Sequence, residues 1–516
     1  MTLKTFWAFL LLATNSTIIL NAQIPQKPKP NWYNLDLKDD GMFGISMEKA
    51  YTQILRGKTA VPVIVAVIDD GLDVRHEDLK NAIWTNMKEI PENGIDDDKN
   101  GYIDDVNGWN FLGSSKESFE FDNELIVIEL RRYQAKFGDK DSTAIAQRDL
   151  PEFRDYIKKQ KVLNTKIQEA RQYVASYENF LKDITTISKK LNKEYPGRDD
   201  FVKFVPADSA LSKARRLIIQ ILDKDPDFKG YVQRTQAQLQ ERKNALQYHL
   251  NLDYDPRAKY ATEFTEDKGR FYGNNNLFGN VPPGHGTHVA GVVGAQRNNH
   301  TGINGVADHV KIMGIRAIPD GYGLDKDEAN AIRYAVDNGA KIINMSFGLS
   351  TATDRKAVLS AINYALSKDV LFVQAAGNSH ENLDTARLYP DRRKHADQKF
   401  ISSFIKVGAS GFIDDTQLAV TFSNYGKHSV DVFAPGLQIN STVPTNLYEA
   451  HSGTSMAAPV VAGLAAVIRE YYPKLKARQV KDIIMRSVEK RVALSELCIT
   501  GGVVNAYNAL QLAETY

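Results

Sequence analysis

Residues 61–71 read VPVIVAVIDDG, and this stretch decides the fold class. Its first eight residues are apolar and mostly β-branched, without the polar alternation of a strand that has one face in water. The run therefore predicts a strand that is covered on both faces, as in a parallel sheet. Asp69 and Asp70 follow directly, where the strand should end.

Five more runs of this kind occur later in the chain. They span residues 310–315, 341–346, 370–376, 405–409 and 430–434. Helical periodicity lies between them over residues 326–338 and 355–368. This alternation predicts an α/β fold, a three-layer sandwich around a mainly parallel central sheet. Active groups of such folds collect at the carboxyl ends of strands, where Asp69 and Asn378 are expected.

The segment 114–251 has a different character. It is almost free of glycine, it is rich in Lys, Glu, Gln and Arg, and its apolar residues recur every three or four positions. This pattern predicts amphipathic helices, punctuated by Pro151, Pro196 and Pro206 and packed as a hairpin with coiled-coil character. We interpret the segment as a large all-α insertion. The sequence leaves open whether it is a lid, a partner-binding arm, an internal regulator or a neutral addition.

The amino-acid composition limits which partners the protein can be expected to bind. The chain has 516 residues, 43% hydrophobic and 25% charged, which is typical of a soluble globular protein. The net charge of +2 gives no reason to expect nucleic acid or a membrane surface as partner. Its one cysteine, Cys498, excludes a disulfide within the chain.

The N-terminus has the pattern of a signal peptide. One positive charge, Lys4, precedes apolar residues at 6–13 and 18–20, and Asn-Ala-Gln closes the stretch. We expect a signal peptide at 1–22 and a proline- and lysine-rich linker at 23–31. The mature protein is then exported, secreted or periplasmic, and retains no membrane span.

Residues 451–459 read HSGTSMAAP, and an apolar helical run follows over 460–468. Ser455 should therefore stand in the first turn of a helix, where unpaired N–H groups and the positive end of the helix dipole lie. A nucleophilic oxygen and a developing oxyanion can share that volume. Taken alone, the pattern fits a simple helix cap as well.

A histidine motif completes the set. Residues 284–291 read GHGTHVAG, so that Asp69, His285 and Ser455 occur in the order Asp, His, Ser along the chain. With these motifs the chain resembles the subtilisin-like serine proteases (subtilases) over residues 40–112 and 262–510. Further shared landmarks are INMSFG at 343–348, AAGN at 375–378, FSN at 422–424, FAPG at 433–436 and GVVNA at 502–506.

The resemblance implies a role for each of these residues. His285 would take the proton of Ser455 and later give it to the leaving amine, while Asp69 would hold the imidazole. Asn378 would donate its amide to the oxyanion beside the backbone N–H of Ser455. His288, one helical turn beyond His285, would be structural. The catalytic domain would then consist of 32–113 and 252–516, interrupted by the insertion at 114–251.

One residue departs from the family pattern. The position after the catalytic aspartate is usually Ser or Thr, and here it is Asp70. A second carboxylate beside Asp69 would raise a pKa by like-charge repulsion if both point into one site. Alternatively, Asp70 turns to solvent or to another donor.

The resemblance also implies how substrate binds. A protein or peptide would add as an extended strand between two walls of the enzyme, so that broad endopeptidase activity is expected. Small residues at 375–377 suggest room for a large apolar side chain. The expected substrate-binding residues are Ser346, Phe347 and Gly348 in one wall, Gly321, Tyr322 and Gly323 in the other, and Ala375, Ala376 and Gly377 along the main pocket.

Residues 96–105 read DDDKNGYIDD, a pattern typical of calcium loops. Position twelve is Asn107 instead of Glu, so either Asp105 closes the site or affinity is lower. So many carboxylates in one short loop repel each other unless a cation neutralises them, so calcium is the expected structural ion. No organic cofactor is expected. A weaker calcium site is implied at Asp78 with the loop 296–299. The predicted ligands of the main site are Asp96, Asp98, Asn100, Tyr102, Asp104 and Asp105.

Two rival readings stay open at this point. In one, the chain is a binding or scaffold protein that uses its helices, and the protease site is silent. In the other, it is a processing protease whose insertion limits access to the site.

Overall fold

The structure is a computed structural model, which describes residues 28–260, 269–349, 351–391 and 402–516. The expected signal peptide at 1–22 and most of the expected linker lie outside the described residues. Within the described ranges, every helix is too short or too polar to traverse a bilayer.

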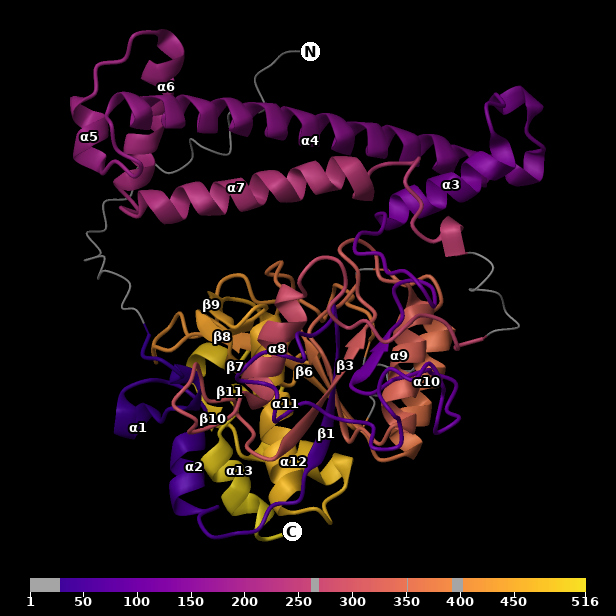
Figure 1. Cartoon of the computed structure of the whole chain (residues 1–516), viewed down its shortest axis with the longest axis vertical. Coiled ribbons are helices and arrows are strands. Elements are labelled where there is room, and N and C mark those ends of the chain that lie inside the picture. Colours follow the sequence, from indigo (N-terminus) through magenta and orange to yellow (C-terminus); the bar gives the residue numbers. More distant parts are fainter. Residues whose placement is uncertain (1–27, 261–268, 350, 392–401) are drawn as a thin grey trace.

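A sheet of nine strands forms the centre of the main domain (Figure 1). Its order is β10-β11-β7-β6-β5-β4-β1-β3-β2, and all neighbours pair in parallel except β10 with β11. The predicted mainly parallel sheet is confirmed. Its strands are β1 Val63–Asp69, β2 Gly108–Asn110, β3 Val310–Arg316, β4 Ile342–Met345, β5 Leu371–Ala375, β6 Phe404–Ser410, β7 Val432–Pro435, β10 Glu489–Lys490 and β11 Gly502–Val503.

Strand β1 shows why the opening run is apolar throughout. Val65 and Val67 belong to a core shared with helices on one face, and Ala66 and Ile68 to a core shared with helices on the other. Both faces are therefore dry, which gives the predicted three layers. The first face carries α2 Met47–Gln53, α8 Gly284–Gly294, α11 Thr454–Tyr471, α12 Ala477–Arg486 and α13 Ala506–Ala513; the second carries α9 Asp325–Asp337 and α10 Arg355–Ser367.

Several short elements carry too little apolar periodicity to be seen in the sequence. A hairpin of β8 (Ile439–Val443) and β9 (Leu447–His451) lies apart from the main sheet, and β9 is mostly exposed. The remaining short helices of the main domain are η1 Trp32–Asn34, α1 Leu37–Asp40, η5 Ala258–Tyr260 and η7 Val492–Leu494.

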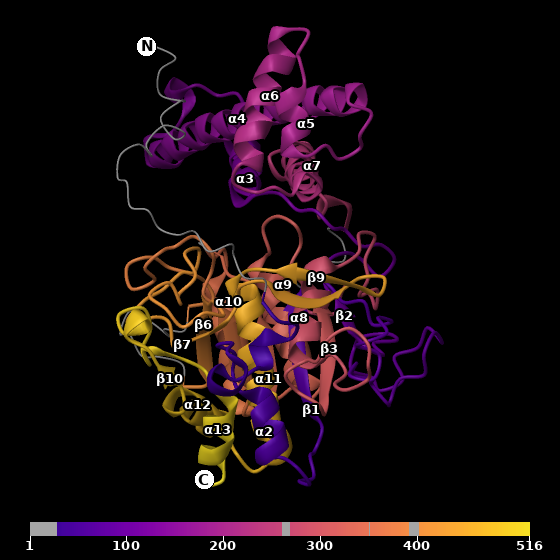
Figure 2. The same cartoon turned by 90° about the vertical axis from the view of Figure 1, so that its left-hand side faces the viewer.

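The segment between the two halves of the main domain is helical, and it lies above that domain in both views (Figures 1 and 2). Helix α4 is 41 residues long, and α7 runs beside it. Two apolar clusters hold the helices together, and both consist only of residues between 126 and 252. The elements are α3 Leu125–Phe137, η2 Ser142–Ala144, η3 Gln147–Asp149, α4 Leu150–Lys190, α5 Arg198–Lys203, α6 Ser209–Leu222, α7 Phe228–Asn244 and a π-helical turn Ala245–His249.

The two ends of the helical insertion are adjacent. The backbone N–H of Glu124 donates to the carbonyl of His249 at 2.9 Å. Just before this point the chain pairs with the loop that follows β3, because Asp122 N–H donates to the Asp320 carbonyl at 2.8 Å. The insertion is therefore joined to the main domain at the carboxyl end of β3.

Candidate active site

Ser455 is the second residue of α11, as its place before the apolar run predicted. Its hydroxyl donates to the backbone carbonyl of Ser346 at 2.9 Å, and the Ser346 hydroxyl donates back to the Ser455 carbonyl at 2.8 Å. Within the described part of the chain no hydrogen bond joins Ser455 to His285. Bonds of this kind commonly tighten only when substrate is bound.

His285 is paired with the aspartate at the end of β1. Its Nδ1 lies 2.6 Å from Asp69 Oδ1, which also accepts the backbone N–H of Asp70 at 2.9 Å. Burial disfavours the imidazolium, but the charges of Asp69 and Asp70 outweigh it and raise the pKa of His285 to about 9. The imidazole is thus held with Nδ1 toward the carboxylate.

The two halves of the site lie over neighbouring strand ends. Strands β1 and β4 are adjacent, with Ile68 opposite Met345. The next residues along each strand are Asp69, which holds His285, and Ser346, which holds Ser455. Adjacent strands are about 4.8 Å apart, so the geometry brings the aspartate, histidine and serine into one region.

Asp70 has turned to another donor, one of the two alternatives that the sequence left open. Its carboxylate accepts the backbone N–H of Gly286 at 2.7 Å and of His285 at 3.2 Å, at the start of α8. Burial, and then the charge of Asp69, raise the pKa of Asp70 above its ordinary value. A Cβ at Gly286 would lie 2.1 Å from the Gly71 carbonyl oxygen, which explains the glycine after the histidine.

The Asp70 side chain also leaves an acceptor without a donor. Asp69 Oδ2 is buried and has no hydrogen-bond partner among the described residues. A serine or threonine at position 70 would carry a hydroxyl donor, which a carboxylate lacks. The departure from the family pattern therefore changes the surroundings of the histidine's partner.

Asn378 is held through the oxygen of its side-chain amide. Its Oδ1 accepts from both the backbone N–H and the Oγ1 of Thr454, each at 2.9 Å. Thr454 Oγ1 in turn accepts the Gly377 N–H at 2.9 Å. These bonds fix which end of the amide is the oxygen, so its Nδ2 is the end that can serve as a donor. Sequence reasoning missed Thr454, although it stands beside Ser455 in the motif.

His288 is excluded as a base by its surroundings. It is fully buried, and its Nε2 donates to the carbonyls of Ile439 at 3.0 Å and Glu449 at 3.1 Å. Its ring stacks on His451 with 4.2 Å between centroids. Burial, and then a charge on His451, lower the pKa of His288 to about 3, so that it stays neutral.

The residues expected to bind substrate lie in two regions. Ser346, Phe347 and Gly348 follow β4, and Ala375, Ala376 and Gly377 end and follow β5, the next strand. The third group belongs to the loop after β3, where the insertion is joined: the Tyr322 N–H donates to the Asn123 carbonyl at 3.1 Å, and a Cβ at Gly321 would lie 2.3 Å from the Asp122 carbonyl oxygen. The Tyr322 side chain is itself buried, and Gly323 follows it.

Leu388 lies beside two of the small residues expected to line the substrate site, Gly348 and Gly377. Leu388 lies so close to Gly348 that an added Cβ there would be 2.6 Å from Leu388 Cγ. A Cβ at Gly377 would be 3.7 Å from Leu388 Cδ1. The fold therefore brings Leu388, a residue distant in sequence, next to these two glycines.

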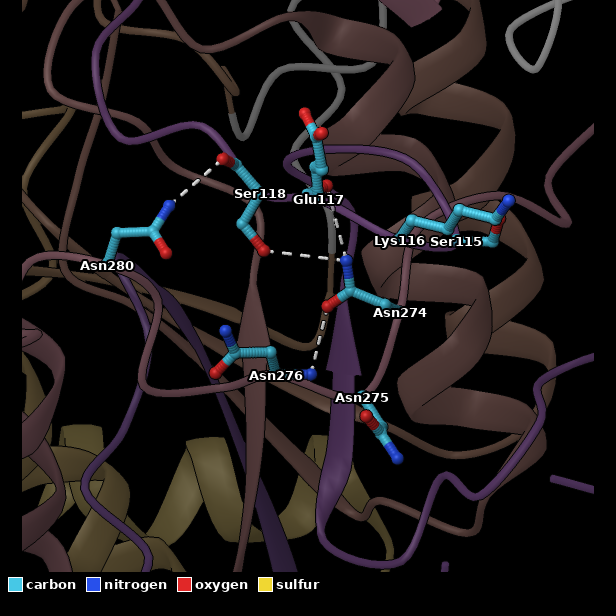
Figure 3. A pocket seen from close by; sticks show the side chains of 8 residues that line it. All are labelled: Ser115, Lys116, Glu117, Ser118, Asn274, Asn275, Asn276 and Asn280. Atoms are coloured by element: carbon cyan, nitrogen blue, oxygen red, sulfur yellow. Dashed lines mark hydrogen bonds between the residues drawn. The ribbon is translucent and has the colours of Figure 1, made fainter. Parts of the chain in front are cut away.

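A polar hollow of about 360 Å³ lies beside the junction with the insertion (Figure 3). Residues 115–118 line one side, and the asparagines Asn274, Asn275, Asn276 and Asn280 line the other. Asn280 Nδ2 donates to the Ser118 carbonyl at 3.1 Å and Asn274 Nδ2 to the Ser114 carbonyl at 2.7 Å. The amides thus tie residues 114–118, which precede the insertion, to the rest of the main domain.

The acidic loop forms a carboxylate cluster. Glu89, Asp96 and Asp98 bring oxygens within 4.8 Å of one another. Asp104 instead accepts the N–H groups of Asn93 and Gly94. Glu89 was missed because it precedes the motif.

The other predicted ligands make hydrogen bonds within the loop. Asp105 accepts from Asn86, Asn100 and the Tyr334 hydroxyl. Asn100 Oδ1 accepts the Tyr102 N–H at 2.8 Å, and the Tyr102 ring is buried. At the weaker site, Asp78 accepts from Asn299 Nδ2 at 2.6 Å and from Ile303 N–H at 3.0 Å.

A serine hydroxyl at a helix start, an imidazole bound to a carboxylate and an oriented side-chain amide meet at the carboxyl edge of a parallel sheet. These are the groups by which serine hydrolases cleave acyl bonds.

Comparison with known proteins identifies the family. The model of the subtilase family matches residues 62–501, and the chain belongs to the subtilase family of serine proteases. Thermophilic serine proteinase of Bacillus sp. (strain AK1) is 38% identical over 227 residues, 44% of this chain and 52% of that protein. Thermitase of Thermoactinomyces vulgaris is 38% identical over 229 residues, 44% of this chain and 75% of that protein.

Further matches have the same character. Subtilisin DY of Bacillus licheniformis is 38% identical over 201 residues, 39% of this chain and 68% of that protein. A solved structure of a protease from Pseudoalteromonas arctica matches with 31% identity and a TM-score of 0.38, and covers 44% of this chain and 70% of that one. The chain spans about half the length of the Bacillus AK1 proteinase.

Proposed function

We propose that the protein is an exported serine endopeptidase that hydrolyses peptide bonds with Ser455 as nucleophile, His285 as general base and acid, and Asp69 as the partner of the imidazole. The observation that carries the proposal is the 2.6 Å bond between His285 Nδ1 and Asp69 Oδ1 beside a serine at a helix start. Export is proposed from the signal-peptide pattern at 1–22.

Catalysis begins when the Ser455 hydroxyl leaves the Ser346 carbonyl and turns to His285 Nε2. The serine oxygen attacks the scissile carbonyl while the imidazole takes its proton, and the Asp69 carboxylate stabilises the resulting imidazolium. The imidazolium then protonates the leaving amine, and an acyl-enzyme ester forms on Ser455. Water, activated by the same imidazole, hydrolyses the ester and restores the serine.

The oxyanion of each tetrahedral intermediate is stabilised by two donors, Asn378 Nδ2 and the backbone N–H of Ser455. The backbone donor lies in the first turn of α11, where it has no partner within the helix and the dipole favours negative charge. Thr454 acts as a positioning residue, because its two bonds to Asn378 Oδ1 turn Nδ2 toward the oxyanion.

An active-site probe tests this proposal. A fluorophosphonate should label the purified protein, and Ser455→Ala should abolish the label. Ser452→Ala is the matched control, because this exposed hydroxyl accepts only the Gln438 N–H within the described residues. A parent protein that takes no label, or a Ser455→Ala variant that is still labelled, contradicts the proposal.

Protein and peptide chains are the proposed substrates, bound in extended form between 346–348 and 321–323. Leu388 narrows the pocket beside Gly348 and Gly377, so small side chains are preferred immediately before the cleaved bond. Profiling with a peptide library checks this preference; equal cleavage after large aromatic residues would contradict it. A chain with a silent site is disfavoured by the paired Asp69 and His285.

Calcium is the proposed structural ion of the loop 96–105. The donors are all oxygens, as Ca²⁺ prefers, and three carboxylates already converge there. Glu89, Asp96 and Asp98 would supply the first ligands, while Asp104 and Asp105 would brace the loop through their bonds to N–H and O–H donors.

Chelation of calcium should lower the melting temperature, and Asp98→Asn should remove that sensitivity. Asp97→Asn is the control, because its carboxylate faces Ile90 N–H and Asn93 instead of the cluster. A melting temperature that chelation leaves unchanged would rule out the ion.

A further inference from the structure

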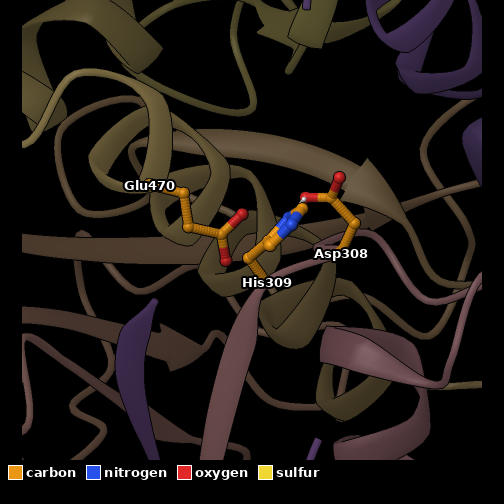
Figure 4. Close-up of side chains that lie close together, drawn as sticks. All are labelled: Asp308, His309 and Glu470. Carbon is orange, nitrogen blue, oxygen red and sulfur yellow. Dashed lines mark ion pairs between the residues drawn. The ribbon is translucent and has the colours of Figure 1, made fainter. Parts of the chain in front are cut away.

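A second cluster of metal-binding groups lies away from the active site. Asp308 and His309 are in the loop that leads into β3, and Glu470 is the penultimate residue of α11 (Figure 4). One ligand atom from each lies within 4.8 Å of the other two. His309 Nδ1 is 3.0 Å from Asp308 Oδ1, and the Tyr471 hydroxyl donates to Asp308 Oδ2 at 2.8 Å.

Glu470 is a buried acidic residue that faces this cluster. The residue has no exposed surface, and neither Oε1 nor Oε2 has a hydrogen-bond partner among the residues that the structure describes. Its carboxylate is directed at His309 and Asp308. Burial, and then the charge of Asp308, raise the pKa of Glu470 well above its ordinary value. A buried carboxylate is costly unless a cation or hydrogen-bond donors compensate it.

The other two groups leave the cluster open to solvent. Asp308 and His309 are exposed, so a metal ion has a path to the buried oxygen atoms. Metal–nitrogen and metal–oxygen distances are about 2.0–2.2 Å for zinc, which puts two ligands of one ion at most about 4 Å apart. The observed spacing needs only a small closing movement.

The donor set selects the kind of ion. Imidazole together with carboxylate suits zinc and similar transition metals, whereas calcium and magnesium take oxygen ligands alone. We propose that Asp308, His309 and Glu470 bind a divalent transition metal of the zinc class, with water completing its coordination. The ion would fasten the end of α11 to the loop before β3.

Zinc titration of the full chain tests the site. Calorimetry is done on the Ser455→Ala protein, which cannot digest itself, with calcium present to fill the acidic loop. We expect one more zinc per chain than in the same protein carrying His309→Ala, and at least tenfold weaker binding at that site with Glu470→Gln. Zinc should raise the melting temperature of the first protein and not of the two variants.

A second histidine serves as a control for the removal of any surface imidazole. His300 is exposed in a neighbouring loop, and His300→Ala should keep the full stoichiometry. Equal zinc stoichiometry with and without His309 would overturn the proposal. So would a Glu470→Gln variant that binds zinc as before and melts higher without it, because Glu470 would then be a neutral buried carboxyl group.

Discussion

Helices α11 and α4 differ in how much of their surface is buried. Of the 18 residues of α11, sixteen are buried, whereas α4 buries seven of its 41. The first helix is packed by the sheet, α8, α12 and α13, and the second buries few of its residues and otherwise faces water. The packing therefore fixes the position of Ser455 tightly, and it fixes the helices of the insertion less tightly.

The contrast extends to charge. Ion pairs of the insertion, such as Arg198 with Asp223, join exposed side chains and contribute little to stability. In the main domain, charged groups such as Asp69 are buried and oriented by hydrogen bonds. We therefore expect the position of the proposed catalytic groups to depend on the packed domain, and the insertion to affect access or recognition. Four changes test this contrast, in order of expected effect.

The largest effect is expected at the oxyanion. Asn378→Ala should lower kcat by about 10²–10³, the loss known for the equivalent donor of subtilisin, a member of this family. Steady-state kinetics on a short peptide measures it, with the fold checked by circular dichroism. Asn244→Ala, in the insertion, is the matched control and should leave kcat unchanged. If both variants lose activity, or if neither does, the two regions do not differ in their importance for catalysis.

Truncation of one buried side chain in each region compares the core of the main domain with that of the insertion. Leu464 in α11 and Ile218 in α6 are both fully buried, but their apolar clusters share no residue. Truncation of either to alanine should cost about 2–5 kcal/mol in its own region. Calorimetry should show two transitions, with Leu464→Ala lowering the one that accompanies loss of activity and Ile218→Ala the other. A single transition, shifted alike by both variants, would show one cooperative unit.

The pH dependence tests the carboxylate pair. Catalysis needs neutral His285, so kcat/KM should rise with pH until the imidazole has lost its proton, near its pKa of about 9. The charge of Asp70 favours the imidazolium, so Asp70→Asn should lower this pKa and move the rise toward acid pH. The rate at pH 7 then increases, by up to about tenfold if the pKa of His285 falls by about one.

The matched control is Asp415→Asn, an exposed acid whose carboxylate accepts the N–H of Gln417. Its profile should overlay that of the parent. If Asp70→Asn overlays the parent as well, the charge of Asp70 has no influence on the histidine.

The smallest effect on chemistry is expected from removal of the insertion. Residues 125–248 are replaced by a short Gly-Ser linker between Glu124 and His249, whose backbones are already hydrogen-bonded. Turnover of a short peptide should stay within about twofold, as for surface changes worth about 0.5 kcal/mol. Casein should be cleaved faster, because the insertion is joined to the loop at 321–323, the proposed wall of the substrate site. Slower casein cleavage would indicate that the helices recruit substrate instead of limiting access.

The sequence predicts much of this molecule, for identifiable reasons. Strands covered on both faces produce apolar runs, so β1 and β3 to β7 were found within a few residues. Ser455, His285 and Asp69 stand in local motifs that carry their own structural context. Leu388 and Glu470 acquire their surroundings only when distant segments fold together, and Glu89 joins its loop from outside the motif. The hairpin β8–β9 was missed because its polar residues give no period.

The bond between Glu124 and His249 has a consequence for the chain as a whole. To the main domain, the intervening helices are a loop whose two ends are already closed, and the entropy of closing a loop grows only with the logarithm of its length. Insertions of very different size would therefore burden folding of the protease almost equally. Any domain whose own termini lie together fits the same junction, beside the segment proposed to bind the substrate.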